Sequence, residues 1–257
     1  MTQDRRGGGR RSRLERGGGG IAQLPWQSVK NPYPPMQLLD EERMQQLHDT
    51  SMRILSELGI RVMSERVMDL FASAGAIVDR EEKTIRIDES LVNEALRAVP
   101  SSFTLTSRNP EKQVHLGGNS LVFGLVAGPP NVHDRINGRR QGNLADYQNF
   151  IKLAHHFNAI HIIGNQVVAP MELPANARHL DTYHANLTLS DLSFHCTAIG
   201  RARAMDGINM MAIARGISVE EMRASPGVTT IISINSPRLF DDAMAEGLIA
   251  MAEHGQP

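Results

Sequence analysis

The chain has 257 residues, 41% of them apolar and 21% charged, an ordinary composition for one large globular domain or two small ones. Its formal net charge of -1 gives no overall field that would attract nucleic acid or an anionic membrane. No apolar run approaches the roughly 20 residues of a membrane helix, and no apolar segment follows the N-terminal arginines as in a secretory signal. Cys196 is the only cysteine, which excludes an internal disulfide. Together, these features favour a reducing, cytoplasmic setting without membrane attachment.

Residues 1–20 differ in composition from the rest of the chain. The stretch RRGGGRRSRLERGGGG is almost entirely arginine and glycine, so it cannot bury enough apolar surface to become ordered. One interpretation is an RNA-binding arm of the RGG type. We favour a disordered, solubilising tail, because the stretch has no aromatic residue and the rest of the chain has no basic surplus. A nucleic acid partner is therefore not expected.

Residues 21–142 predict an α+β lead-in region. A helix is predicted over about residues 41–58, with Asp40 as its N-cap and Gly59 as its end. Two shorter helices are predicted from Ser64 and before Pro100. Strands are predicted within residues 76–88, 103–108, 113–117 and 120–124. Apolar residues at helical spacing give the first helix one apolar stripe, which includes Met44, Leu47, Ile54, Leu55 and Leu58.

From residue 143 onward, short apolar strands alternate with amphipathic helices. The strands are predicted at about residues 160–164, 193–198 and 228–234. The helices are predicted after Asn143, over about residues 176–190 and 202–215, at Ser218 and Glu221 as a capped turn, and within residues 238–255. This alternation is typical of parallel βαβ units. Three strands cannot close a barrel, which needs about eight, so residues 143–257 are expected to be the first three βα units of an incomplete barrel.

Two segments of the sequence resemble the trimethylamine methyltransferase family. They are GPPNVHDRINGRRQGNLADYQNFIKLAHHFNAIHIIG and TTIISINSPRLFDDAMAEGLIAMAEHGQP, and the segment ELGIRV also fits. The matching features are Val132, Asp134, Gly138-Arg139-Arg140, Asp146, Leu153, Gly164 and the Ser236-Pro237 turn. The resemblance covers nearly the whole chain and depends on the order and spacing of these features.

The resemblance implies a fold and a reaction. Members of the family are nearly twice as long, fold as (β/α)8 barrels and move a methyl group from a methylated amine or betaine to the cobalt of a corrinoid on a separate protein. The chain would then be the N-terminal portion of a TIM-type barrel. It would bind no cofactor directly, and its partners would be the amine and the corrinoid protein. A homo-oligomer is compatible with this.

The same resemblance places the catalytic residues outside this sequence. In the trimethylamine branch of the family, pyrrolysine engages the amine, and its position belongs to the C-terminal half. Other members lack pyrrolysine and act on quaternary amines such as glycine betaine. The 257 residues alone are therefore expected to have little activity. The alternative is a catalytically inactive amine-binding or scaffold fragment.

Substrate ligands are expected where the parallel strands end, because barrel active sites lie at the carboxyl ends of the strands. Asn165 and Asn235 follow the first and third predicted strands, and His195 lies on the second. Their side chains are able to orient a betaine carboxylate by hydrogen bonding. Each also has a structural interpretation: both Asn residues as turn residues, and His195 as an interior histidine.

The sequence predicts neither a metal site nor a cysteine nucleophile. The histidines show no HExxH or Cys/His ligand spacing. His195 and Cys196 are adjacent on a strand, so their side chains point to opposite faces and are poorly placed for proton transfer. A buried, inert thiol is the expected state of Cys196.

Overall fold

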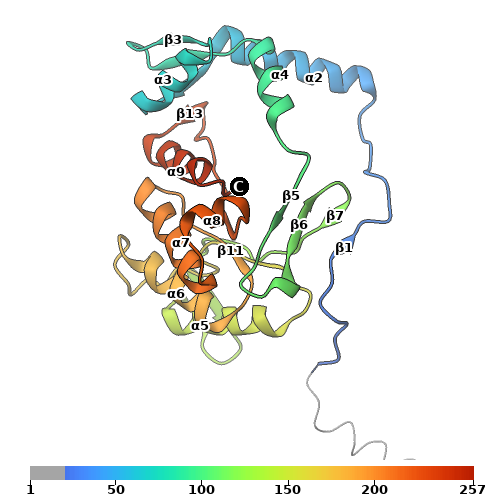
Figure 1. Cartoon of the computed structure of the whole chain (residues 1–257), viewed down its shortest axis with the longest axis vertical. Helices are drawn as coiled ribbons and strands as arrows, with labels where there is room; N and C mark the ends of the chain where they lie inside the picture. Colours follow the sequence, from blue (N-terminus) through green and yellow to red (C-terminus); the bar gives the residue numbers. More distant parts are fainter. Residues whose placement is uncertain (1–20) are drawn as a thin grey trace, which may run out of the picture.

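The computed structural model of the protein describes residues 21–257, and the predicted tail at residues 1–20 lies outside them. The described fold is mixed α/β (Figure 1). A part built mainly from residues 41–98 lies at one end of the molecule, and a parallel sheet with its helices lies at the other. The last helix lies between these two parts in Figure 1.

The lead-in elements follow the predicted order. Helix α2 (Glu41–Arg53) begins after Asp40, whose carboxylate accepts a hydrogen bond from the Arg43 amide at 2.9 Å. A π-helical turn (Ile54–Leu58) continues it to Gly59. The elements that follow are β2 (Ile60–Val62), α3 (Glu65–Ser73), β3 (Ile77–Asp79), β4 (Thr84–Arg86) and α4 (Glu89–Ala98). The predicted helices and strands of this stretch are confirmed.

A distant segment completes the sheet of the lead-in. The strand order is β13-β2-β4-β3, with β13 (Leu239–Phe240) parallel to β2. The prediction of a helix over these two residues is wrong, because their pairing with Arg61 and Val62 holds them extended. Helix α9 (Asp242–Glu253) begins only after Asp241, whose carboxylate accepts a hydrogen bond from the Met244 amide at 2.7 Å. The regions predicted as 21–142 and 143–257 thus share one sheet.

The second part contains the predicted parallel sheet. Its strands, in spatial order, are β10 (Ile162–Ile163), β11 (Ser193–His195) and β12 (Val228–Thr229). The helices that alternate with them are α5 (Leu144–His156), α6 (Arg178–Leu189), α7 (Arg201–Arg215) and α8 (Val219–Ala224). The predicted alternation is confirmed, but the third strand is shorter than residues 228–234. His195 is the last residue of β11 and pairs with Thr229. Beyond Thr229, no strand in residues 21–257 is present for β12 to pair with, so β12 ends there.

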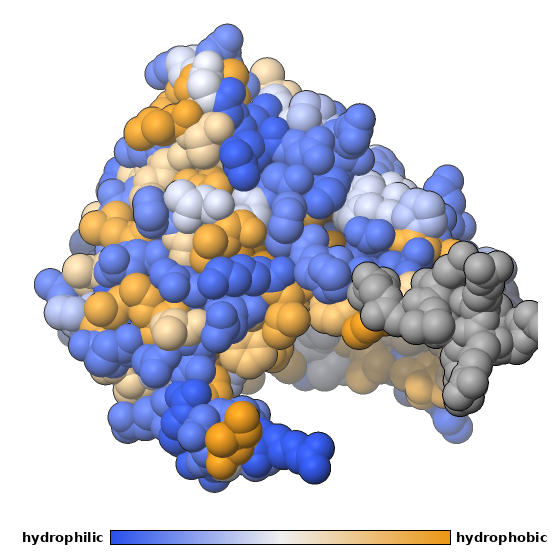
Figure 2. All heavy atoms as spheres, turned by 90° about the horizontal axis from the view of Figure 1, so that it is seen from below, coloured by the Kyte–Doolittle hydropathy of each residue, from blue (hydrophilic) through white to orange (hydrophobic). Residues whose placement is uncertain are grey.

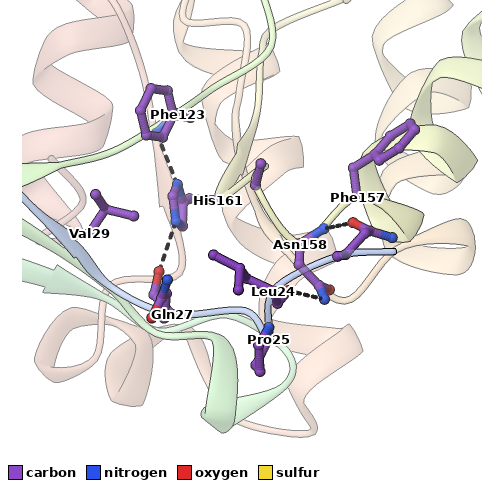
Figure 3. Close-up of a pocket in the computed structure, with 10 residues that line it drawn as sticks. Leu24, Pro25, Gln27, Val29, Phe123, Phe157, Asn158 and His161 are labelled. Atoms are coloured by element: carbon purple, nitrogen blue, oxygen red, sulfur yellow. Dashed lines mark hydrogen bonds between the residues drawn. The ribbon is translucent and has the colours of Figure 1, made fainter. Parts of the chain in front are cut away.

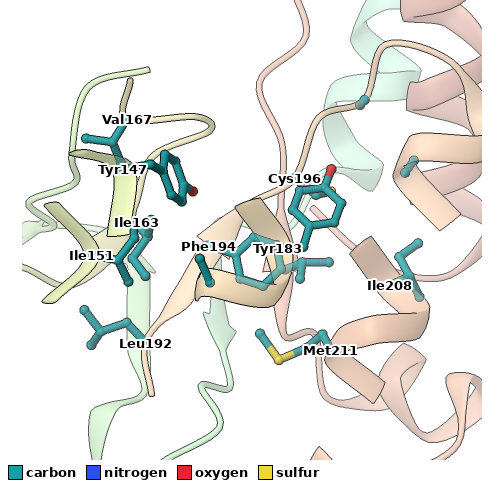
Figure 4. Close-up of a cluster of buried hydrophobic side chains, with 14 of the residues drawn as sticks. Tyr147, Ile151, Ile163, Val167, Tyr183, Leu192, Phe194, Cys196, Ile208 and Met211 are labelled. Atoms are coloured by element: carbon teal, nitrogen blue, oxygen red, sulfur yellow. The ribbon is translucent and has the colours of Figure 1, made fainter. Parts of the chain in front are cut away.

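The main hydrophobic core lies between this sheet and its helices (Figure 4). Ile163, Phe194 and Val228 are register partners, so they share the face of the sheet that the helices cover. The ring centroid of Tyr183 from α6 lies 5.3 Å from that of Phe194, and Met211 of α7 packs in the same cluster. Burial of one such large apolar side chain contributes about 1.5–3 kcal/mol.

The opposite face of the sheet meets the hairpins of the lead-in. Ile162 is buried in a small cluster with Leu105 and Val114, and the Ser193 hydroxyl lies 3.1 Å from that of Ser107. The strands involved are β5 (Ser102–Leu105) and β6 (Val114–Gly117), which are antiparallel and joined by a short 3-10 helix (Pro110–Lys112). Beside them, β1 (Val29–Lys30) pairs with β7 (Ser120–Leu121).

A hairpin leads into the first helix of the second part. It consists of β8 (Asn131–Asp134) and β9 (Gly138–Gln141). Asn143 and Asp146 form a reciprocal capping box at the start of α5, which confirms Asn143 as the predicted cap. The two guanidinium nitrogens of Arg140 bind the Asp146 carboxylate, one of them at 2.7 Å, so β9 is tied to this helix start.

The α/β class is therefore shown, but no sheet in residues 21–257 closes into a barrel. The apolar stripe of α2 does not form core: no residue of that helix is buried, and Met44 and Leu47 are both more than half exposed. None of the described helices has the length and hydrophobicity to cross a membrane. Seen from below, apolar and polar side chains alternate in small groups across the described surface (Figure 2).

Candidate functional site

Two concavities lie at opposite ends of the parallel strand β10. The larger, of about 400 Å³, is at its amino end and is bounded by the lead-in segment around Leu24 and by Asn158 (Figure 3). The side chain of Asn158 donates a hydrogen bond to the Leu24 carbonyl at 2.9 Å. In open parallel α/β sheets, ligands bind outside the carboxyl ends of the strands, so this cavity at the amino end is the less favoured site.

His161 fixes the lead-in across that cavity. Its Nδ1 accepts a hydrogen bond from the Phe123 amide at 3.0 Å, which leaves Nε2 to donate to the Gln27 carbonyl at 3.1 Å (Figure 3). Both ring nitrogens are thus occupied, and the side chain is only 3% exposed. These contacts assign His161 a structural role.

The second concavity, which we call the arginine pocket, lies at the carboxyl ends of β10 and β11 and has a volume of about 360 Å³. Its lining residues come from the ends of both strands, the start of α6 and the first turn of α7: Ala127, Gly128, Asn165, Gln166, Ala175, Arg178, Thr197, Ile199 and Arg203. The Thr197 hydroxyl donates a hydrogen bond to the Asn165 side-chain oxygen at 2.8 Å. The structure therefore places the predicted residue Asn165 in the wall of a pocket.

Glycine at position 164 allows the chain to form this wall. A Cβ atom there would lie 2.8 Å from the Leu125 carbonyl carbon and nearer still to its oxygen. The segment that contains Leu125 and Gly128 therefore runs close beside the end of β10, where Gly124 forms a parallel bridge with Ile162 and the Gly128 amide donates to the Gln166 carbonyl at 2.9 Å. Asn165 follows Gly164 immediately and lies in the pocket lining.

Two arginines provide the only formal charges in the pocket lining. Arg178 donates to the Leu173 carbonyl at 2.8 Å, and Arg203 donates to the Ala175 carbonyl at 3.2 Å. Neither guanidinium has a carboxylate within 4 Å among residues 21–257, and the Nε atom of Arg178 is buried without any hydrogen-bond partner there. The local field is therefore positive and suits an anion.

Tyr183 connects two backbone segments of the arginine pocket by hydrogen bonds. Its hydroxyl accepts a hydrogen bond from the Thr197 amide at 2.6 Å and donates to the Arg203 carbonyl at 3.4 Å. Burial raises the pKa of Tyr183 far above its ordinary value, so the group is a neutral hydrogen-bonding support. The pocket is therefore suited to binding and orienting a ligand, since its lining of amide, hydroxyl and guanidinium groups contains no side chain that gains or loses a proton near neutral pH.

His195 lies near the arginine pocket but is not in its lining. It shares a sheet face with its register partner Thr229, and its Nδ1 is buried without a partner among the described residues. Burial lowers the pKa of His195, so the ring is neutral near pH 7. A role for His195 as a substrate ligand remains a prediction.

Asn235 lies apart from the other two predicted ligands. It is exposed in the segment after β12, and its side-chain nitrogen donates to the Asp241 carboxylate at 2.8 Å. Its backbone also pairs with that of Leu239. These contacts fit the turn interpretation, and substrate binding by Asn235 remains a prediction.

Cys196 is buried, as predicted. The thiol is fully buried, on the opposite face from His195, and lies 3.6 Å from the Met251 sulfur. Burial raises the pKa of Cys196 to about 12, so the nucleophilic thiolate is absent near neutral pH. Residues 21–257 also contain no group of three or more His, Cys, Asp or Glu residues placed to hold a metal ion.

Residue-by-residue reasoning from the sequence missed Arg178 and Arg203. One signal was available, because a cation in the first turn of a helix opposes the helix dipole. Helix α7 begins with Arg201 and Arg203, has no acidic residue in its first turn and has no side-chain cap. Such a helix start is favourable when an anion lies near it.

Comparison with known proteins assigns a family. The model of the family described as Trimethylamine methyltransferase (MTTB) matches residues 5–257. The chain is 33% identical to glycine betaine methyltransferase of Desulfitobacterium hafniense over 223 residues, which are 87% of this chain and 46% of that protein. It is 22% identical over 219 residues to a trimethylamine methyltransferase MttB of the same species, covering 84% of this chain and 44% of the relative.

A third relative is the proline betaine:corrinoid methyltransferase of Eubacterium limosum, 29% identical over 119 residues, which are 46% of this chain and 24% of that protein. The chain spans less than half the length of each of these curated relatives.

Proposed function

The chain belongs to the trimethylamine methyltransferase family, and from this membership we propose that it is part of an enzyme that transfers a methyl group from a quaternary amine to a corrinoid carried by a partner protein. The 33% identity to a glycine betaine methyltransferase over 87% of the chain is the observation that carries the proposal. It makes glycine betaine the first donor to test. The chain supplies part of the donor site, and the corrinoid is the methyl acceptor.

The proposed reaction makes modest demands on the protein. The electron pair of cobalt(I) forms the new bond to the methyl carbon, while the pair of the breaking carbon–nitrogen bond remains on nitrogen. The donor leaves as a neutral tertiary amine, so the step needs no proton. The protein's tasks are to hold the donor in line with the acceptor and to match its charge. The arginine pocket supplies cationic and neutral groups, which suit the orientation of a donor that carries a carboxylate.

We also propose that β10, β11 and β12 are the first three strands of a (β/α)8 barrel that further residues complete. Their parallel order and the helices between them support this proposal. Barrel active sites lie at the carboxyl ends of the strands. Asn165 and the proposed ligands His195 and Asn235 would then belong to the amino-terminal half of the donor site, and the catalytic residues to the other half.

The test uses the full product of the reading frame that encodes this chain. It is mixed with cob(I)alamin and, in turn, with glycine betaine, trimethylamine, proline betaine and carnitine, and the absorbance of cobalt(I) is followed. We expect loss of cobalt(I) and formation of methylcobalamin with at least one donor. Binding of a methylated amine without methyl transfer to any corrinoid acceptor would contradict the proposal and favour the amine-binding or scaffold alternative.

A further inference from the structure

We propose that the arginine pocket binds the carboxylate of the methyl donor, with Arg178 and Arg203 as its ligands. The donor class would then be zwitterionic betaines, since simple methylamines have no carboxylate. The identity of the donor rests on the proposed function. The anion site itself rests on the charges and contacts of the pocket.

The positive charge of the arginine pocket is not balanced by a carboxylate of the described residues. Arg178 and Arg203 both lie at the pocket, and no carboxylate among residues 21–257 lies within 4 Å of either guanidinium. Arg201, two residues before Arg203 in the same helix turn, is different, because it binds Glu253 at 2.7 Å. A partly buried cation without an anionic partner is costly. The missing partner is therefore expected to be a bound anion.

The Nε atom of Arg178 is buried and has no hydrogen-bond partner among the described residues. Each guanidinium has five N–H donors in a fixed planar fork. Arg178 donates to the Leu173 carbonyl and, at 3.8 Å, to the Met171 sulfur, and Arg203 donates to the Ala175 carbonyl. N–H donors therefore remain on both arginines, and a guanidinium is able to bind a carboxylate through two such donors.

Hydrogen bonds to the backbone hold the pocket in place without a ligand. The two carbonyl acceptors belong to one short segment before α6, so both arginines are anchored to the same stretch of chain. The Tyr183 hydroxyl joins the backbones of Thr197 and Arg203. The uncapped start of α7 adds its positive dipole end beside Arg203. Preorganisation of this kind lowers the entropy cost of binding.

The residues that line the arginine pocket suit the carboxylate end of a betaine and not its ammonium end. A quaternary ammonium group is held by aromatic faces or carboxylates, and the described pocket lining contains neither. The volume of about 360 Å³ is at the small end of the range for ligand sites. The pocket therefore receives the anionic end of a small zwitterion and leaves its trimethylammonium end directed outward, toward the acceptor.

The test measures equilibrium binding to the full reading-frame product by calorimetry. Glycine betaine is compared with choline, which keeps the trimethylammonium group and lacks the carboxylate. We expect Arg178→Met and Arg203→Met each to weaken glycine betaine binding roughly 10- to 100-fold and to change choline binding little. Arg178→Lys keeps the charge without the planar fork and should give an intermediate loss.

Arg201→Met is the matched control, because it removes an arginine of the same helix turn that already binds Glu253. It should leave glycine betaine affinity unchanged. Circular dichroism and urea unfolding establish that each variant is folded. If Arg178→Met fails to fold, Arg178→Lys and Arg203→Met carry the test.

Three results would overturn the inference. The first is unchanged glycine betaine affinity in the folded arginine variants, and the second is an equal loss for glycine betaine and choline. The third is arginine-dependent binding of inorganic phosphate that acetate and glycine betaine do not displace, which would make the pocket a phosphate site. A different result would show that the proposed function fails while the anion site stands. That result is betaine binding that depends on the two arginines, with no methyl transfer to cobalt.

Discussion

Helix α9 packs against the end of β11 through a glycine, and an added methyl group there gives a sharp test of this packing. In Gly247→Ala the new Cβ would lie 2.6 Å from the carbonyl carbon of Ala198 and 2.9 Å from its Cβ. Ordinary carbon–carbon contacts are about 3.5–4.0 Å, so the helix or the strand end must move by about 1 Å. Ala198 lies between Thr197 and Ile199 of the arginine pocket, so this movement also displaces the pocket wall.

The expected loss of stability follows from two opposing effects. Overpacking against backbone costs up to about 3 kcal/mol. Alanine is the better helix former by about 1 kcal/mol. The net destabilisation is therefore about 2 kcal/mol, which is about a 30-fold change in the unfolding equilibrium constant.

Urea unfolding of wild type and Gly247→Ala measures this difference. Leu248→Ala is the control, because its side chain is on the same helix but 42% exposed, and it should cost less than about 1 kcal/mol. A Gly247→Ala protein as stable as wild type, or more stable, would refute the close approach of α9 to the end of β11.

Three further predictions use the same measurement. Asn143→Ala removes the N-cap of α5 and should cost about 1 kcal/mol; no change would argue against the capping box. Burial opposes ionisation of Asp191, but Lys112 at 2.9 Å and its other partners outweigh this effect and lower its pKa. Asp191→Asn should therefore destabilise by about 1–3 kcal/mol at pH 7, and the difference from wild type should shrink as the pH falls below about 4; a constant difference would contradict this. Burial lowers the pKa of His195 in the folded protein, so as the pH falls this histidine is protonated in the unfolded chain before it is protonated in the folded one. The wild type should therefore lose stability as the pH falls below about 6.5. The free energy of unfolding of His195→Gln should fall less over the same pH range. Parallel pH profiles of stability for the variant and the wild type would contradict this prediction.

Features that depend on neighbouring residues were predictable from the sequence. The start of α5 is an example, because Asn143 and Asp146 stand three residues apart and cap the helix by themselves. The parallel strands were found from their short apolar runs. The position of Asn165 at a strand end was also predictable, because a polar residue after a short apolar run is recognisable without the fold.

Features that depend on distant contacts were missed. The pairing of Leu239 with Arg61 joins segments far apart in the chain, and a helical pattern nearby concealed it. Arg178 and Arg203 meet only because α6 and α7 both begin at the carboxyl edge of the sheet. The apolar spacing in α2 predicted the helix correctly. It did not show whether another element covers the apolar stripe, and Leu47 of that stripe is exposed.

The central claim is that this chain takes part in moving a methyl group from a quaternary amine to cobalt. The most direct measurement supplies glycine betaine with isotope-labelled methyl groups to the full reading-frame product and cob(I)alamin, and follows the label by NMR. We predict one labelled methyl group on cobalt for each dimethylglycine released, with the rate reduced in Arg178→Met. Dimethylglycine formed without methylated cobalt, or no demethylation of any quaternary amine, would contradict it.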